Sequence, residues 1–366
     1  MILMKSNFMN KKINFFSADK KQLKKIFISI EEKSFRAEQM MQWIYKKLNK
    51  NIEKNSNFSK KLKIFIKDNF TFNLPDLIKE KNSFDKTIKW IFKIEKQKIE
   101  TIYIPEKNRA TLCISSQIGC LVGCQFCATG MQGFNRNLET SEIIGQIWIA
   151  KKIIKNRSLK KKMHPITNIV FMGMGEPLLN LPNITKAISI IKDKNGFSIS
   201  KRRITISTVG IPKGIDQLRL LKIDVILAIS LHAPNEKIRS IIIPFSKKYS
   251  IHSILKSAER YRIFSKANKK ILTIEYIMIK NINDKKEHAL ELSKILKSQF
   301  FKINLIPFNP FFGSFYQRSD LNNVKNFANI LKKKNFFVTI RKVRGEDIQA
   351  SCGQLVGKVI NKISLK

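Results

Sequence analysis

The stretch from Ala110 to Cys127 reads ATLCISSQIGCLVGCQFC. Its first residues form a short apolar run typical of a buried strand, and its second part carries Cys120, Cys124 and Cys127 in one short loop. Three nearby glycines allow the backbone to fold tightly around a bulky centre, namely Gly119, Gly123 and Gly130. We therefore take a strand that ends in a three-cysteine loop as the starting point for predicting both fold and chemistry.

Strand-like and helix-like segments alternate regularly around this stretch. Apolar, β-branched runs recur at Ala110–Ser116, Asn168–Met172, Arg203–Thr208, Val225–Leu231, Leu272–Ile279, Lys302–Phe308 and Phe337–Val343. Amphipathic stretches lie between them, for example at Ser141–Lys155, Asn183–Lys194, His252–Arg262, Lys285–Lys297 and Leu321–Lys334. Such alternation predicts an α/β fold in which helices cover a parallel sheet or barrel.

Polar motifs follow these strands, at the end where the active site of a parallel barrel lies. They are Gly173–Pro177, Ser207–Gly210, Ser230–His232, Pro307–Pro310 and Arg344–Asp347, with Cys352 shortly after the last. Each motif is weak alone, because a lone Gly-x-Gly is usually a turn and a lone His is usually a core side chain. Their shared position predicts one site, built from loops at the carboxyl ends of the strands.

The segments before residue 106 differ in character. Residues 1–80 contain short Lys-rich helical patterns, such as Ala37–Leu48 and Phe58–Phe65, and predict a small helical accessory domain. Residues 81–105 contain alternating apolar and polar positions and predict a small β segment that links the two parts. We therefore expect the core barrel at residues 106–346 and a C-terminal segment at 347–366 that carries Cys352.

Composition restricts the class of protein. The chain has 366 residues, 43% of them apolar, and its 26 Phe can fill a sizeable core, which excludes a disordered tail protein. The net charge of +43 is spread along the chain, as expected for a biased surface composition, and it also agrees with a polyanionic partner. No apolar run approaches the roughly 20 residues that span a bilayer, and no signal-peptide core follows Met1, so we expect a cytoplasmic protein.

The cysteines indicate metal or redox chemistry. There are five, including Cys113 and Cys352, and an odd number without a secretory signal argues against a disulfide framework. A structural zinc site and an ordinary cubane cluster each take four ligands. Three thiolates on a four-iron cluster would leave one iron open for another group, whereas a zinc loop would need Cys113 or a His as fourth ligand. The residues alone leave both possibilities open.

Together these motifs resemble the radical S-adenosylmethionine (SAM) superfamily. The resemblance rests on the C-x3-C-x-aromatic-C loop after the first barrel strand and on Glu176 in its glycine-rich segment. Within the superfamily, further stretches are similar to a family of RNA methyltransferases that modify adenine. These stretches are Ile99–Pro105, Ala110–Cys113, Gly133–Leu138, Ser230–Pro234 and Ala350–Leu355.

The resemblance implies a partial parallel (β/α) barrel of the radical SAM type and two cofactors. One 4Fe–4S cluster would be held by Cys120, Cys124 and Cys127, with SAM chelating the open iron. The implied SAM contacts are Gly175, Glu176, Ser207, Ser230, Leu231, His232 and Asn309.

The resemblance also implies a reaction, the methylation of carbon 2 of adenine in 23S rRNA and next to the anticodon in tRNA, with two SAM consumed. Cys352 would carry the methyl group as S-methylcysteine, and Glu100 would accept a proton. Cys113 would resolve the covalent RNA adduct and end in a disulfide with Cys352. Implied partners are an electron donor such as flavodoxin or ferredoxin and a disulfide reductant, and a monomer suffices. The N-terminal helical domain then becomes a candidate RNA-binding part.

Two other functions fit parts of the sequence. A sister enzyme of the same superfamily methylates carbon 8 of the same rRNA adenine, confers antibiotic resistance and would share the five cysteines. A zinc-stabilised RNA-binding protein without catalysis would explain the cysteine loop and the basic charge. Nucleoside mass spectrometry distinguishes the first alternative from methylation at carbon 2, because 2-methyladenosine and 8-methyladenosine separate chromatographically. The metal content distinguishes the second alternative, because it would hold zinc instead of an iron–sulfur cluster.

Overall fold

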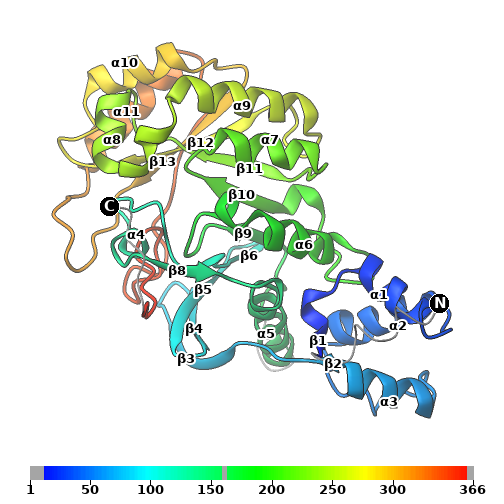
Figure 1. Cartoon of the computed structure of the whole chain (residues 1–366). Coiled ribbons are helices and arrows are strands. Elements are labelled where there is room, and N and C mark those ends of the chain that lie inside the picture. The colour runs from blue at the N-terminus through cyan, green and yellow to red at the C-terminus, as the bar shows by residue number, and fades with distance from the viewer. Residues whose placement is uncertain (1–11, 159–162, 361–366) are drawn as a thin grey trace. The chain divides into compact units, whose positions relative to one another are not determined.

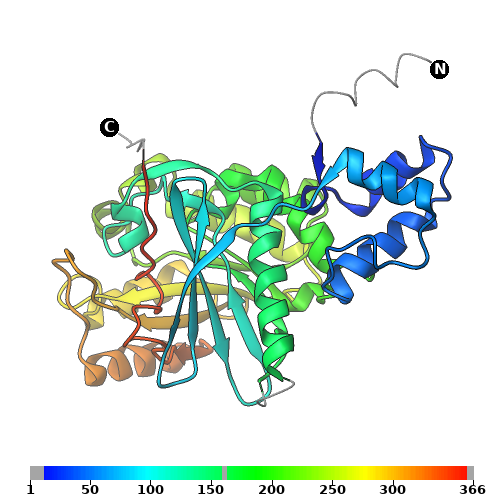
Figure 2. The same ribbon diagram turned by 90° about the horizontal axis from the view of Figure 1, so that it is seen from below.

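The computed structural model describes residues 12–158 and 163–360 and is drawn as a ribbon in Figures 1 and 2. Its contacts divide the chain into two compact units. The first comprises Met1–Asp76, Leu138–Pro165 and Pro182–Ser200, and the second comprises Leu77–Asn137, Ile166–Leu181 and Lys201–Lys366. The predicted domain boundaries stay predictions. Within the described ranges, no helix has the length and apolar character needed to cross a membrane.

The first unit is mainly helical, and it includes two segments, Leu138–Pro165 and Pro182–Ser200, that lie within the range expected for the core barrel. Its elements are β1 (Ile13–Asn14), η2 (Phe15–Ser17), α1 (Lys20–Ile28), α2 (Phe35–Met41), η3 (Gln42–Lys46), α3 (Lys60–Asn69), β2 (Phe70–Thr71), α5 (Thr140–Ser158) and α6 (Leu181–Lys192). Asp19 and Gln22 form a capping box that starts α1, with the Asp19 Oδ1 accepting from the Gln22 N at 2.8 Å. Trp148 on α5 packs its ring 6.0 Å from that of Phe16 and donates its indole N–H to the Ile44 carbonyl oxygen. Aromatic packing therefore holds the core of this unit together.

A ten-stranded sheet dominates the second unit, in the order β14-β13-β12-β11-β10-β9-β6-β5-β4-β3. The strands are β3 (Asp76–Asn82), β4 (Ile88–Ile94), β5 (Gln97–Pro105), β6 (Ala110–Cys113), β9 (Asn168–Phe171), β10 (Ile204–Thr208), β11 (Ile226–Ser230), β12 (Leu272–Met278), β13 (Phe301–Pro307) and β14 (Val338–Ile340). Strands β6 and β9 to β14 pair in parallel, which confirms the predicted sheet. Because β6 and β14 are not paired with each other, the barrel is open.

Helices connect the parallel strands and lie along one face of the sheet (Figure 1). They are α7 (Pro212–Leu220), α8 (Glu236–Ile242), α9 (Ile251–Phe264), α10 (Lys286–Ile295) and α11 (Leu321–Lys333). On α11, Val324, Phe327, Ala328 and Leu331 are buried and share one face at helical spacing. Strand–helix alternation therefore places the loops after the strands at one edge of the sheet.

The segment predicted as a small linking sheet is part of the large sheet instead. Strand β4 pairs antiparallel with β5, and β5 pairs antiparallel with β6, where Tyr103 lies opposite Leu112. Residues Ile99–Tyr103 of β5 are all buried, so both faces of this strand are covered and it cannot stand in a separate two-sided hairpin.

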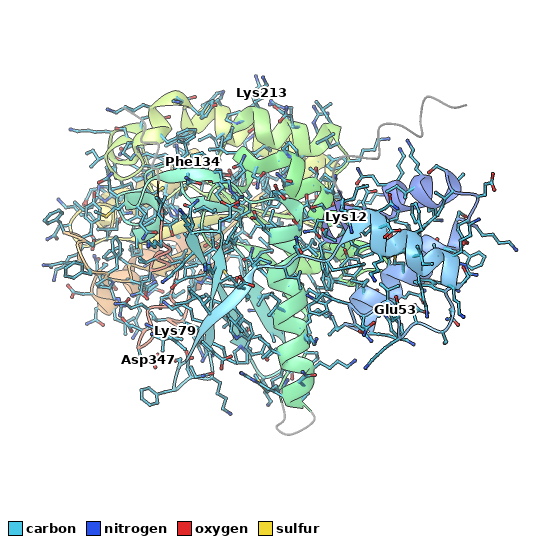
Figure 3. All side chains as sticks on the ribbon, turned by 60° about the horizontal axis from the view of Figure 1, so that its bottom comes forward. Lys12, Glu53, Lys79, Phe134, Lys213 and Asp347 are labelled. Atoms are coloured by element: carbon cyan, nitrogen blue, oxygen red, sulfur yellow. The ribbon has the colours of Figure 1, made fainter. Side chains whose placement is uncertain are left out.

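Lysine side chains are distributed widely over the surface of the second unit. Figure 3 shows Lys79 on β3 and Lys213 on α7 extending outward from different elements, and both are exposed. This distribution agrees with the prediction that the positive charge is spread along the chain rather than concentrated in one arm.

Candidate active site

One cavity lies at the carboxyl ends of the parallel strands and collects side chains from most of the predicted motifs. Its lining includes Cys120, Cys124, Cys127, Gly175, Glu176, Ser207, Ser230, His232 and Cys352. Four of the predicted site residues do not line it, namely Glu100, Cys113, Leu231 and Asn309. The structure therefore brings nine of the thirteen predicted site residues to one cavity, and the other four lie outside its lining.

The cysteine loop lies between two short elements, β7 (Gln117–Gly119) and α4 (Ala128–Met131). Gly119 has a φ of +74°, and a Cβ there would lie 2.0 Å from the Gly133 carbonyl oxygen. The Cys120 N donates to that same oxygen at 2.8 Å, and the Cys127 N donates to the Cys124 carbonyl oxygen at 3.2 Å. The loop is therefore tightly curled, and glycine at position 119 is sterically required.

The thiols of this loop fit the donor set of a 4Fe–4S cluster. A cluster binds one thiolate on each iron, so its ligands surround a volume instead of converging on one ion. Among the described residues, no three His, Cys, Asp or Glu side chains are grouped as a single-ion site requires. Burial and the neighbouring thiols of Cys120 and Cys127 raise the pKa of Cys124. Neighbouring buried thiolates repel one another, and a cationic metal group that replaces the thiol protons would stabilise them.

Glu176 is held rigidly at the cavity wall. Its Oε2 accepts a hydrogen bond from the Val209 N at 2.9 Å, and its Oε1 accepts one from the Leu178 N at 3.0 Å. Burial raises the pKa of Glu176 to about 7, although both of these bonds favour the ionised form. The carboxyl group thus needs a cationic partner to be fully ionised near neutral pH, and the amine of SAM is a group of that kind.

Ser207, Ser230 and His232 lie on adjacent strand ends. The two serine hydroxyl oxygens are 3.1 Å apart. The His232 Nδ1 accepts from the Ile277 N at 3.0 Å, and burial lowers the pKa of this imidazole to about 3. The ring is therefore neutral, and its proton is on Nε2. The ring of Phe126 in the cysteine loop packs edge-on against it, with centroids 4.9 Å apart.

Arg239 on α8 is fully buried behind this wall. Its Nε donates to the Leu231 carbonyl oxygen at 3.1 Å, and its Nη2 donates to the Val209 carbonyl oxygen. Arg239 thereby holds together the loops that follow β10 and β11. Its Nη1 has no hydrogen-bond partner in the described part of the chain. Sequence reasoning missed this residue, although its spacing from the buried Ile242 places both on the inner face of α8.

Cys352 lies on a loop that is attached to the cavity on several sides. The Asn309 Nδ2 donates to the Cys352 carbonyl oxygen at 3.0 Å, which explains why Asn309 lies beside the cavity. The Ala128 N at the start of α4 donates to the Gly353 carbonyl oxygen at 2.7 Å, and the Thr129 hydroxyl donates to the Leu355 carbonyl oxygen at 2.7 Å. The Cys352 side chain itself is exposed to the cavity.

A buried ion pair holds both ends of the Cys352 loop. Lys89 on β4 and Glu100 on β5 lie 3.2 Å apart between Nζ and Oε1, and both side chains are almost fully buried. The Lys89 Nζ also donates to the Gln349 carbonyl oxygen at 2.9 Å, and the Val356 N donates to the Glu100 Oε2 at 3.1 Å. Glu100 is therefore bonded to the segment that carries Cys352, and Lys89 is a second residue that sequence reasoning missed.

Arg341 acts electrostatically on both Cys113 and Cys352, because its guanidinium lowers the pKa of each thiol. The surrounding protein atoms raise the pKa of the Cys352 thiol, while the Arg341 guanidinium lowers it. Burial, together with Cys352, raises the pKa of Cys113 to about 12. Arg341 also pairs with Glu275 at 3.6 Å. Cys113 and Cys352 are both free thiols, and no disulfide joins them in this structure.

A second cavity adjoins the first at Cys352, which lines both. Asn309 and Glu275 also belong to its lining. Its basic lining residues are Arg109, Arg202, Lys302, Arg341, Lys342 and Arg344. Because acidic side chains are fewer here, the cavity offers a positively charged surface next to Cys352.

Comparisons with known proteins agree with this geometry. Residues 13–71 match the ribosomal RNA large subunit methyltransferase N-terminal domain, and residues 114–293 match the radical SAM superfamily. The solved structure of a radical SAM methyltransferase from Sphaerobacter thermophilus superposes with a TM-score of 0.85 at 33% identity, covering 94% of this chain and 99% of that one. The expected radical SAM fold is therefore confirmed.

Full-length relatives are more similar still. The dual-specificity RNA methyltransferase RlmN of Wigglesworthia glossinidia brevipalpis is 56% identical, over 98% of this chain and 93% of that protein. The RlmN of Buchnera aphidicola subsp. Schizaphis graminum (strain Sg) is 53% identical, over 98% of this chain and 97% of that protein. Identity at this level along almost the whole chain, together with a radical SAM fold, shows that the chain belongs to the RlmN family of radical SAM RNA methyltransferases.

Proposed function

We propose that this enzyme methylates carbon 2 of adenine in 23S rRNA and, next to the anticodon, in tRNA, with Cys352 as the methyl carrier. The observation that carries the proposal is the position of Cys352 on the wall of the cavity that Cys120, Cys124, Cys127 and Glu176 also line. Carbon 2 lies between two ring nitrogens and is electron-poor, so it does not attack the methyl group of SAM as an amine would. A thiol beside a radical-generating site can accept the methyl group first, and the methyl group can then react with carbon 2 as a radical.

The residues around the cavity have distinct roles in binding. Cys120, Cys124 and Cys127 would hold one 4Fe–4S cluster through their sulfurs. Gly175, Glu176, Ser207, Ser230 and His232 would contact SAM from the cavity wall, and Leu231 and Asn309, which lie outside its lining, would complete the set. When bound, the cluster and SAM together supply a 5′-deoxyadenosyl radical.

Cys352 would first act as a nucleophile. As a thiolate, favoured by Arg341, its sulfur takes a methyl group from one SAM molecule, and S-adenosylhomocysteine leaves. The resulting S-methylcysteine would present its methyl group to the cavity, where one hydrogen atom passes to the 5′-deoxyadenosyl radical and the methylene carbon left on the Cys352 sulfur adds to carbon 2 of adenine. The adduct then loses the proton of carbon 2 and one electron, which the oxidised cluster would take back. The target base must be unpaired or flipped for carbon 2 to reach this position.

Cys113 and Glu100 would complete the reaction. Glu100 is our candidate acceptor for the proton lost from carbon 2, because burial raises its pKa and its carboxylate is bonded to the Cys352 segment. The Cys113 sulfur then attacks the Cys352 sulfur, and the bond from that sulfur to the methylene carbon breaks with its electron pair on carbon. The proton of the Cys113 thiol completes the methyl group of the released RNA, and a disulfide forms between the two cysteines. Two electrons from a disulfide reductant restore both thiols.

The remaining partners are also part of this proposal. We propose a flavodoxin or ferredoxin as the electron donor, a monomeric enzyme and a cytoplasmic location. Anaerobic reconstitution with iron and sulfide tests the cofactor directly. A brown protein whose reduced-cluster EPR signal changes on addition of SAM supports the proposal, whereas a colourless protein that holds one zinc contradicts it.

Isotope labelling tests the route through Cys352. With SAM deuterated at the methyl group, a methyl group delivered intact would carry three deuterium atoms into the RNA. A route through a methylene carbon replaces one of them with hydrogen, so the RNA would gain a CHD2 group. Mass spectrometry of the isolated methyladenosine distinguishes the two products, and a CD3 group would contradict the proposed route.

A further inference from the structure

The loop between β13 and α11 presents two aromatic rings to solvent close to the Cys352 segment. Phe312 is 100% exposed and Phe315 is 98% exposed. In Figure 1 this loop is the orange segment that projects away from the sheet after β13. Two fully exposed large apolar side chains in one short loop are candidates for an interaction site.

The loop is built to hold these two rings outward. Its other aromatic residues, Phe311 and Tyr316, pack against the buried Phe308, with ring centroids 6.2 and 6.3 Å from it. The Ser314 N donates to the Phe311 carbonyl oxygen at 3.1 Å and closes a tight turn. The Arg318 Nε fixes the end of the loop by donating to the Phe308 carbonyl oxygen at 2.7 Å. A loop anchored in this way loses little further freedom when the outward rings bind a partner.

Direct hydrogen bonds connect this loop to the segment of the methyl carrier. The Asn309 Nδ2 donates to the Cys352 carbonyl oxygen at 3.0 Å. The Gln354 Nε2 donates to the Pro310 carbonyl oxygen at 2.7 Å. The base of the loop thus contacts the Cys352 segment at Cys352 itself and at Gln354, only a few residues before the outward rings.

The charge next to this loop indicates the kind of partner. Asn309, at the base of the loop, and Cys352 line the second cavity, whose basic residues include Arg341 and Arg344. An apolar protein segment would gain little from such a lining, whereas a nucleic acid strand offers phosphates to the cations and flat bases to the rings. Single-stranded RNA is recognised in this way, by stacking of unpaired bases on aromatic side chains together with phosphate contacts.

We propose that Phe312 and Phe315 form a stacking platform for unpaired RNA bases that flank the adenine presented to Cys352. The inference rests on the proposed function, in which Cys352 methylates an RNA base. The platform would hold the neighbouring nucleotides splayed open and so help to keep the target adenine unpaired.

The first test measures binding of an in vitro transcribed tRNA to the full reconstituted enzyme. Phe312→Ala and Phe315→Ala should each raise the Kd roughly 5- to 150-fold, as expected for loss of one base–aromatic stack. Phe312→Tyr and Phe315→Tyr keep an aromatic ring and should bind as the wild type does. Ile263→Ala removes an apolar side chain that is 73% exposed on α9 and lines neither cavity, and it controls for loss of exposed apolar surface.

Salt dependence separates stacking from phosphate contacts. Stacking releases no counterions, so the slope of log Kd against log salt concentration should be the same for the alanine variants and the wild type. A changed slope would contradict stacking. Alanine variants that bind tRNA as tightly as the wild type would overturn the proposal.

A second readout reports on the ring itself. Phe315→Trp places an indole in the platform, and its fluorescence should fall when tRNA is added. The wild type, which carries the buried Trp90 and Trp148 and the half-buried Trp43, is titrated in parallel, and its change is subtracted. An unquenched signal in a variant that binds tRNA normally would overturn the proposal. If the wild type methylates RNA and the alanine variants bind and methylate as well as it does, only the platform fails. If the wild type methylates no RNA, the proposed function itself fails.

Discussion

At the scale of single residues, Lys89 and Glu100 show how a buried charge pair can order a catalytic segment. Burial lowers the pKa of Lys89 and raises that of Glu100, while each partner counteracts the shift of the other. Their remaining hydrogen-bonding groups reach Gln349 and Val356, on either side of Cys352. The pair therefore fixes the loop that carries Cys352, at the cost of desolvating two charges.

Removing one partner of this pair should lower the free energy of unfolding substantially. Lys89→Met leaves the Glu100 carboxylate buried without a counter-charge, so we expect a loss of about 3–5 kcal/mol in the free energy of unfolding. Lys280→Met breaks a more exposed ion pair with Asp320, 3.2 Å long, and should cost at most about 1 kcal/mol. Denaturant titration of both variants measures the two losses of stability. Equal losses would show that the buried pair stabilises the protein no more than the exposed pair does.

Cys352→Ala should abolish RNA methylation without disturbing the cluster. The substitution removes the sulfur that we propose as the methyl carrier, while Cys120, Cys124 and Cys127 remain. We expect the iron and sulfide content and the visible absorbance of the reconstituted variant to match those of the wild type. Retained turnover would rule out Cys352 as the methyl carrier.

Cys113→Ala should trap an intermediate. Without the Cys113 sulfur, the bond between Cys352 and the RNA is not resolved, so a protein–RNA adduct should accumulate once Cys352 is methylated. A denaturing gel measures the adduct as a band of retarded protein that nuclease treatment converts back. Free migration of protein and RNA in this variant would contradict the resolving role.

At the scale of elements, the turn after β9 depends on glycine because it lies directly against β7. Gly175 has a φ of +98°, and a Cβ there would lie 2.5 Å from the Gln117 Cβ. The Gln117 Oε1 also accepts from the Glu176 N at 2.8 Å. Close contact between the turn and β7 thereby sets the position of the Glu176 carboxylate.

Gly175→Ala should therefore lower both the melting temperature and the affinity for SAM. Gly313→Ala is a matched control, since Gly313 also has a positive φ, +84°, but no atom lies within 4 Å of the Cβ it would gain. Both variants strain the backbone, and only Gly175→Ala adds a clash. Calorimetric titration with SAM and thermal melts compare them, and equal effects would mean that the contact with Gln117 is unimportant.

Elements differ in how far the sequence could predict them. The parallel strands were predictable because β-branched runs such as Val225–Leu231 are local signals. The cysteine loop and the Gly175–Glu176 turn were predictable because their residue types are unusual at that spacing. The pairing of β5 with the main sheet could not be predicted, because burial of both faces of β5 depends on partners that are distant in sequence. The contacts of Lys89 and Arg239 are equally nonlocal, and no pattern within β4 marks Lys89 as buried.

At the scale of the whole molecule, the net charge of +43 should control how RNA binds rather than which base reacts. Affinity for tRNA should fall steeply with salt, because bound phosphates release counterions. Lys342→Gln, in the second cavity, should reduce the log–log slope by about one. Lys213→Gln, on the exposed face of α7, should leave it unchanged, and salt titrations that give both variants the same slope would contradict a phosphate contact in that cavity.

Nucleoside mass spectrometry tests the central claim most directly. Unmodified 23S rRNA would be incubated anaerobically with the reconstituted enzyme, SAM and a reductant, and then digested to nucleosides. Our account predicts 2-methyladenosine, formed by the wild type and not by Cys352→Ala. Formation of 8-methyladenosine, or of no methyladenosine by an enzyme whose cluster responds to SAM, would contradict it.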